Sequence, residues 1–141
     1  MKTLWFIIIV CAAATSYVEA GTNEIYLLSH STNKRDCEWY LSLDKNKTMP
    51  KWNPLKEQLP FPAEKAVKMA SDWIKKTEKL NFEPELWSII LRPIQPNEKE
   101  FKYSYFYVLK FGTGLFQTSL CVILMDGTIL EPRSKYGLIQ K

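Results

Sequence analysis

The sequence predicts an α+β fold in which one amphipathic helix packs on an antiparallel β-meander of about four strands. Alternate residues from Phe101 to Phe111 are aromatic or aliphatic, which is the period of a β-strand. Apolar residues from Ala63 to Ile74 recur at helical spacing. Asp126-Gly127, between two apolar runs, is typical of a tight hairpin turn. The helix therefore precedes the meander and covers the aromatic face of its central strand.

The first residues have the pattern of an export signal. Lys2 precedes an apolar run from Leu4 to Ala14, and Val18 and Ala20 occupy the small-residue positions that signal peptidase requires. We expect cleavage after Ala20 and a secreted or periplasmic mature chain. The apolar run is shorter than the about 20 residues of a membrane-spanning helix, so no stable membrane span is expected after cleavage.

The segment after the signal peptide is harder to assign. Gly21 to Arg35 is mostly polar and is expected to form an arm or a short edge strand. Trp39, Leu41 and Leu43 alternate with polar residues, which predicts a strand that extends the sheet. Four prolines in the segment 45–62 predict an extended loop.

The core follows this loop. The helix is expected over residues 62–78, with a proline in its first turn. Strands are expected at Leu86–Ile94, at Phe101–Phe111, at Thr118–Met125 and, ending before Pro132, at Thr128–Glu131. We therefore divide the chain into a signal peptide (1–20), an N-terminal arm, strand and proline-rich loop (21–58), a helix-and-meander core (59–132) and a polar tail (133–141).

The central strand is also apolar on the face opposite its aromatic row. Phe106 and Val108 lie on that face, and Thr118–Met125 is apolar on both of its faces. One cover is the chain's own arm and loop, which would supply Trp39, Leu41, Trp52 and Leu55. The other is a protein partner or a second copy of the chain, which would make Phe106 and Val108 a possible interface.

Two cysteines, Cys37 and Cys121, remain after cleavage. An oxidising compartment would allow a disulfide between them. Cys121, inside an apolar strand, could equally be a small buried hydrophobic residue, so both interpretations stay open. Asn46-Lys47-Thr48 has the form of a glycosylation site, which is used only where the host glycosylates its exported proteins.

The residue types give no catalytic, cofactor or metal site. His30 is the single histidine, and a zinc site would need further ligands from Cys37, Cys121 and carboxylates. Gly112-Thr113-Gly114 precedes no helix, so it is not a phosphate-binding loop. The net charge of +4 comes without a nucleic-acid-binding motif. We therefore expect neither an enzyme, nor a cofactor, nor a nucleic-acid partner.

A family resemblance rests on two stretches, Pro62–Ala70 in the helix and Val122–Leu130 around the hairpin turn. Their order resembles the cystatin-like helix-on-sheet arrangement, and in particular the PepSY-type modules of small exported bacterial proteins, over about residues 61–132. The Gln-x-Val-x-Gly hairpin of cystatin-type inhibitors is replaced here by residues 94–98. The resemblance implies a non-catalytic binding or regulatory module that acts on a peptidase or envelope protein. The alternative is a structural or dimerising envelope protein without a small-molecule ligand.

Overall fold

The computed structural model describes residues 8–9, 17–32, 35–94, 103–115 and 117–134. Most of the predicted signal peptide, the expected turn at Pro96–Asn97, the first residues of the strand expected from Phe101 and most of the polar tail lie outside these ranges. The elements are β1 (Ile8–Ile9), β2 (Tyr17–Val18), β3 (Glu24–Ser31), β4 (Asp36–Ser42), α1 (Leu43–Thr48), β5 (Lys51–Trp52), α2 (Ala63–Thr77), β6 (Glu85–Ile94), β7 (Tyr103–Gly114), β8 (Gln117–Leu124), β9 (Ile129–Leu130) and β10 (Arg133–Ser134).

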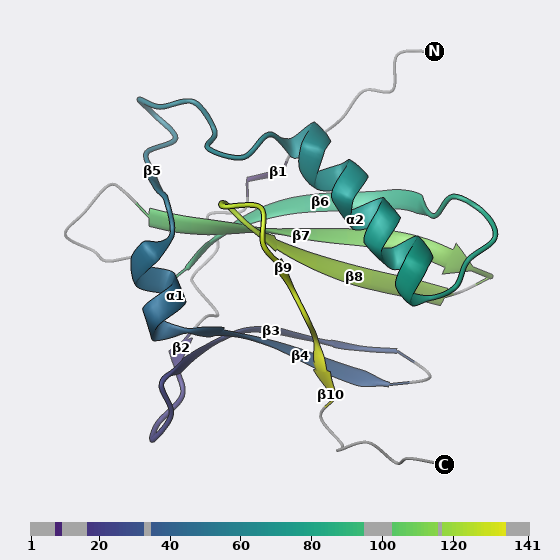
Figure 1. Ribbon diagram of the computed structural model, residues 1–141, viewed down its shortest axis with the longest axis horizontal. Helices are drawn as coiled ribbons and strands as arrows, with labels where there is room; N and C mark the ends of the chain where they lie inside the picture. The colour runs from purple at the N-terminus through teal and green to yellow at the C-terminus, as the bar shows by residue number, and fades with distance from the viewer. Residues whose placement is uncertain (1–7, 10–16, 33–34, 95–102, 116, 135–141) are drawn as a thin grey trace.

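These elements form three layers (Figure 1). Helix α2 lies on one side of a larger sheet with the strand order β1-β6-β7-β8-β9, in which β5 also pairs with β7. A smaller sheet with the order β10-β4-β3-β2 lies on the other side. Pairing within the meander from β6 to β9 is antiparallel throughout. The predicted α+β class is therefore confirmed.

Helix α2 covers the aromatic face of β7. Ala66, Ala70 and Ile74 are fully buried, and their small or compact side chains let the helix lie close to the sheet. The hydroxyl of Tyr107 donates a hydrogen bond to the carbonyl of Phe61, just before the helix, at 2.7 Å. The helix predicted over residues 62–78 is confirmed, with Ala63–Thr77 as its bounds.

The chain itself covers the opposite face of β7. Phe106 and Val108 on that face are only 1% and 6% exposed. The smaller sheet lies over them and contributes buried side chains to the same core, namely Ile25, Leu27, Trp39 and Leu41. The two side chains predicted to form an interface are therefore buried within a single chain.

Two details of the predicted fold need correction. About four strands were expected, whereas the described residues form a six-stranded and a four-stranded sheet. The N-terminal strand does not extend the meander, because β4 pairs with β3 and β10 in the smaller sheet. Its hairpin partner β3 contains an irregularity between Tyr26 and Leu28 that interrupts the alternation of its apolar residues.

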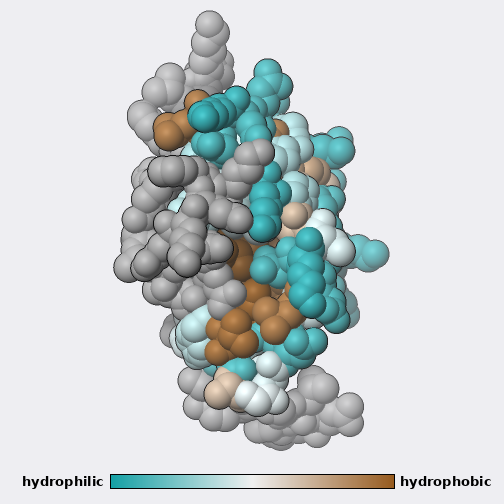
Figure 2. Space-filling model, turned by 90° about the vertical axis from the view of Figure 1, so that its left-hand side faces the viewer, coloured by the Kyte–Doolittle hydropathy of each residue, from teal (hydrophilic) through white to brown (hydrophobic). Residues whose placement is uncertain are grey.

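The proline-rich loop also differs from expectation. It begins inside α1, where the Ser42 hydroxyl accepts a hydrogen bond from the Lys45 amide at 3.1 Å and so caps the helix. Trp52 does not cover the back of the sheet but packs edge-to-face on Tyr105, with ring centroids 5.1 Å apart, on the aromatic face. Leu55 is 84% exposed and covers nothing. Figure 2 views the end of the molecule that carries α1 and β5, and apolar side chains gather near the middle of this face beside polar ones.

Short strands lie inside the predicted signal peptide. β1 pairs in parallel with β6, with Ile8 opposite Ile90, and β2 pairs with β3. Cleavage after Ala20 would remove both strands. β6 and β3 would then become edge strands of their sheets.

The burial of Phe106 gives a first prediction. Phe106→Ala should lower the free energy of unfolding by about 3–5 kcal/mol, because it leaves a cavity between the two sheets. Leu55→Ala, at an exposed position, should change it by no more than about 0.5 kcal/mol. Chemical denaturation measures both variants. A Phe106→Ala chain with unchanged stability but an altered sedimentation coefficient would instead place Phe106 in an interface between chains.

Candidate functional site

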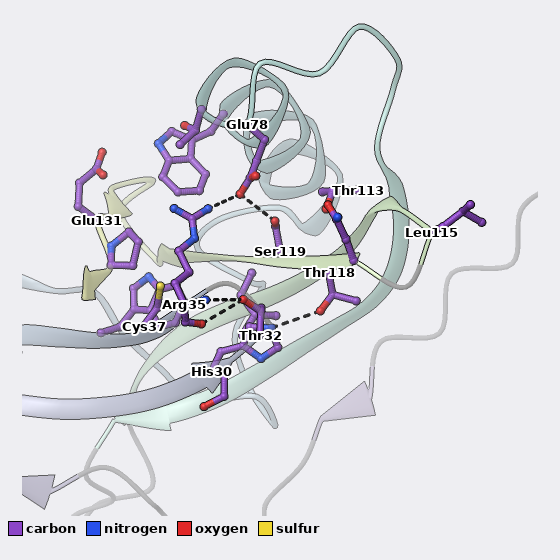
Figure 3. A pocket seen from close by; sticks show the side chains of 17 residues that line it. His30, Thr32, Arg35, Cys37, Glu78, Thr113, Leu115, Thr118, Ser119 and Glu131 are labelled. Atoms are coloured by element: carbon purple, nitrogen blue, oxygen red, sulfur yellow. Dashed lines mark hydrogen bonds and ion pairs between the residues drawn. The ribbon is translucent and has the colours of Figure 1, made fainter. Parts of the chain in front are cut away.

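A pocket of about 640 Å³ opens where the end of α2, the hairpin of β3 and β4, and strand β8 meet (Figure 3). These segments are far apart in the sequence, and only the fold brings them together. The hairpin contributes His30, Arg35 and Cys37; α2 and its cap contribute Trp73 and Glu78; and β8 contributes its residues from Gln117 to Leu120. Glu131 and Pro132, directly after β9, complete the wall.

An ion pair spans the pocket from one wall to the other. Arg35 Nη2 lies 2.5 Å from Glu78 Oε1, and the same oxygen accepts a hydrogen bond from the Ser119 hydroxyl at 3.0 Å. The Arg35 side chain is 54% exposed and that of Glu78 is 26% exposed, so water reaches both groups, and ion pairs in such contact with solvent contribute only about 0–1 kcal/mol to stability. A ligand that offers either group a better partner can therefore displace this pair at small cost.

The hairpin tip holds Arg35 at the mouth of the pocket. The Thr32 amide and hydroxyl both donate to the Arg35 carbonyl, at 2.9 and 3.0 Å. The Arg35 amide in turn donates to the Thr32 hydroxyl at 3.1 Å. These hydrogen bonds fix the backbone of Arg35, whereas its exposed side chain can change conformation when a ligand binds.

His30 has neighbours that the sequence did not indicate. Its Nε2 lies 3.3 Å from the Thr118 hydroxyl on β8. Within the smaller sheet it stands directly opposite Cys37, and opposite residues in an antiparallel pair share a face. No local pattern in the sequence indicates this pair, because it arises from the register of the β3–β4 hairpin.

A histidine beside a cysteine raises the question of nucleophilic catalysis, which requires a thiolate next to a base. Burial raises the pKa of the Cys37 thiol. Burial, together with the positive charge of Lys110, lowers the pKa of His30. Both shifts favour a neutral thiol beside a neutral imidazole. In the described part of the chain no hydrogen bond joins the two side chains, and both line the pocket.

The other predicted site residue, Cys121, is not among the residues that line the pocket. It is fully buried and lies opposite Leu109 on the face of the larger sheet that α2 covers. Burial raises the pKa of its thiol to about 12. Cys37 and Cys121 are both free in the structure, in different sheets. The disulfide considered from the sequence is therefore not formed here.

Within the ranges that the structure describes, no group of three or more histidine, cysteine or acidic side chains is placed to hold a metal ion. Among the same residues, no helix has the length and apolar character needed to cross a membrane.

The single histidine allows a direct pH test. Nuclear magnetic resonance titration should give His30 a pKa below its ordinary value of about 6.5. Because the unfolded chain then takes up the proton first, the free energy of unfolding should fall as the pH drops below about 6.5. Lys110→Met should raise the pKa by removing a positive charge, and Lys68→Met, on the exposed side of α2, should not. An unshifted His30 pKa would mean that the imidazole is solvated and not packed in this pocket.

Thiol labelling tests the state of the cysteines. A chain that starts at Gly21, unfolded without reductant, should show both thiols, Cys37 and Cys121. In the folded chain Cys37 should react slowly and Cys121 only after unfolding, because burial limits access and raises both thiol pKa values. An unreduced, unfolded chain with no reactive thiol would establish the disulfide instead.

Comparison of this chain with protein-family models, with curated proteins and with solved structures found no match. We therefore infer what the pocket binds from the chain's own residues. The resemblance to cystatin-like and PepSY-type modules remains a prediction.

Proposed function

We propose that this chain is an exported, non-catalytic module that binds a protein partner through the pocket beside β8. The observation that carries the proposal is the pocket itself: side chains from three separate segments converge there around an ion pair that is easily exchanged. Its volume lies within the range of about 300–1,000 Å³ typical of ligand sites. Export is proposed from the signal-peptide pattern of residues 1–20.

The order of the elements supports a peptidase or an envelope protein as the partner. Helix α2 is followed by the antiparallel strands β6, β7, β8 and β9, as in the cystatin-like and PepSY-type modules that the sequence resembles. By that resemblance the partner is a peptidase or an envelope protein, which is an analogy of fold. The alternative is a dimerising structural protein, but Phe106 and Val108, the interface expected for a partner or a second copy, are buried within the chain and offer no surface for either.

A pair of variants on one helix tests the pocket. Thr77→Trp places a bulky ring at the pocket wall, whereas Lys76→Trp, one residue earlier, lies outside the lining residues. Both positions are exposed, so both variants should fold, as thermal melts will verify. When the mature chains are cross-linked within the exported fraction, wild type and Lys76→Trp should capture the same partner, and Thr77→Trp should lose it.

Two results would contradict this function. Retention of the partner by Thr77→Trp would place binding elsewhere on the molecule. A hydrolytic activity that Cys37→Ser or His30→Ala abolished would make the Cys37–His30 pair catalytic and the chain an enzyme.

A further inference from the structure

Among the described residues, part of one edge of strand β8 has no pairing strand, and this part lies at the pocket. β8 runs from Gln117 to Leu124, but β9 pairs with it only at Val122 and Ile123. If that register continued, Pro132 would stand opposite Leu120. Proline has no amide hydrogen and cannot extend a ladder of backbone hydrogen bonds. The pairing partner of β8 therefore stops just where the pocket begins.

The chain leaves the larger sheet after this proline. Arg133 pairs with Glu38 in the smaller sheet, and its guanidinium donates to both carboxylate oxygens of Glu24, at 2.7 and 2.5 Å. The same guanidinium lies 4.9 Å from the centre of the Tyr40 ring. These contacts hold β10 on β4, so the chain does not return to the edge of β8 at Arg133–Ser134.

The direction of the open backbone groups follows from the hairpin. The Leu124 amide donates to the Thr128 carbonyl at 2.9 Å, so it points toward β9. In an antiparallel ladder, alternate residues direct their backbone groups to the same side. Leu120 and Thr118 therefore direct their N–H and C=O groups toward the side of β9, which is the pocket, while Ser119 and Cys121 pair with β7. Across the described ranges no strand pairs with β8 on that side before Val122.

The β8 edge lies between two walls of the pocket, which the Arg35–Glu78 ion pair bridges. Glu78, the C-cap of α2, stands on one side of the β8 edge, and Arg35 and Cys37 of the hairpin stand on the other. A second copy that paired its own β8 edge here would bring its own helix end and hairpin into the same space. A single strand from a partner does not have this obstacle.

The charges of the pocket favour a basic strand. Its lining includes two carboxylates, Glu78 and Glu131, and one permanent cation, Arg35. His30 adds no charge at neutral pH, because its pKa is lowered. In the described part of the chain Glu131 forms no ion pair, and it lies at the end of β9, next to where an added strand would begin. The exposed Arg35 side chain already forms an ion pair with Glu78, and a basic side chain of a ligand could take its place.

We propose that the partner inserts an extended segment that pairs with Thr118 and Leu120 as an additional β-strand, and that this segment carries a lysine or arginine next to Glu78 or Glu131. This proposal rests on the binding function proposed above and specifies its partner. Backbone hydrogen bonds supply affinity, as in other complexes formed by strand addition, and the two carboxylates select the basic side chain.

The experiment uses a display library of random heptapeptides, selected on the mature chain. Thr118→Pro removes one amide hydrogen from the open edge, whereas Thr118→Val keeps it and removes only the hydroxyl that contacts His30. Peptides enriched on wild type should carry lysine or arginine. They should bind Thr118→Val with less than about threefold loss and Thr118→Pro with at least about tenfold loss.

A second measurement needs no protein variant. An enriched peptide is N-methylated on one set of alternate residues or on the other set. Strand addition predicts that only one of the two methylated peptides loses binding, because only alternate amides face β8. Equal binding of the two methylated peptides would overturn the proposal. In the display selection, enrichment of acidic peptides or of no peptide at all would also overturn it, and so would equal binding of the enriched peptides to Thr118→Pro and wild type. A dimer that Thr118→Pro dissociates would make a second copy of the chain the occupant and would also overturn it.

The two proposals fail in different ways. A partner that Thr77→Trp loses but Thr118→Pro keeps would leave the binding pocket standing and reject strand addition. A partner kept by both variants would reject both proposals.

Discussion

The structure depends on one constraint, that the central strand β7 must be removed from water on both faces. From Tyr105 to Leu109 every side chain is buried, which is unusual for an antiparallel sheet with a helix on only one side. Helix α2 covers the aromatic face, so the other face needs a second layer. The hairpin of β3 and β4 provides it, and residues 24–42 are thereby part of the core and not an arm.

The pocket follows from how this second layer is attached. Pro132 ends the pairing of β9 with β8, and Arg133 then ties the chain to Glu24 and Glu38 in the smaller sheet. The crossing joins the two sheets, and among the described residues no strand pairs with the first half of β8 on the side of β9. In such a binding site the unpaired backbone groups of an edge strand form hydrogen bonds with any extended segment. The surrounding side chains then determine which segments bind more tightly.

The sequence predicted the elements that have strong local signals. Helical spacing gave α2, alternation gave β7, and Asp126-Gly127 gave the hairpin between β8 and β9, because each of these patterns is complete within a short stretch. The smaller sheet was missed because the irregularity between Tyr26 and Leu28 breaks the alternation of β3, and alternation in β4 cannot tell which sheet a strand joins. Helix α1 was missed because it is short and polar and buries no residue.

The site could not be found from local patterns, since it is assembled from α2, β8 and the β3–β4 hairpin. Two signals were nevertheless present in the sequence. Pro132, shortly after the hairpin turn, limits the length of β9 and so leaves the edge of β8 open. A hairpin turn between Thr32 and Arg35 would have placed His30 opposite Cys37.

The most direct test of this account is residue-resolved amide hydrogen exchange on the free mature chain. It measures both the coverage of β7 and the open edge of β8 without any ligand. We expect slow exchange along β7 from Tyr105 to Leu109, slow exchange at Ser119 and Cys121, and fast exchange at Thr118 and Leu120. Equal protection at all four β8 positions would mean that the edge is already paired, and fast exchange in β7 would mean that the second layer does not cover it; either result would contradict the account.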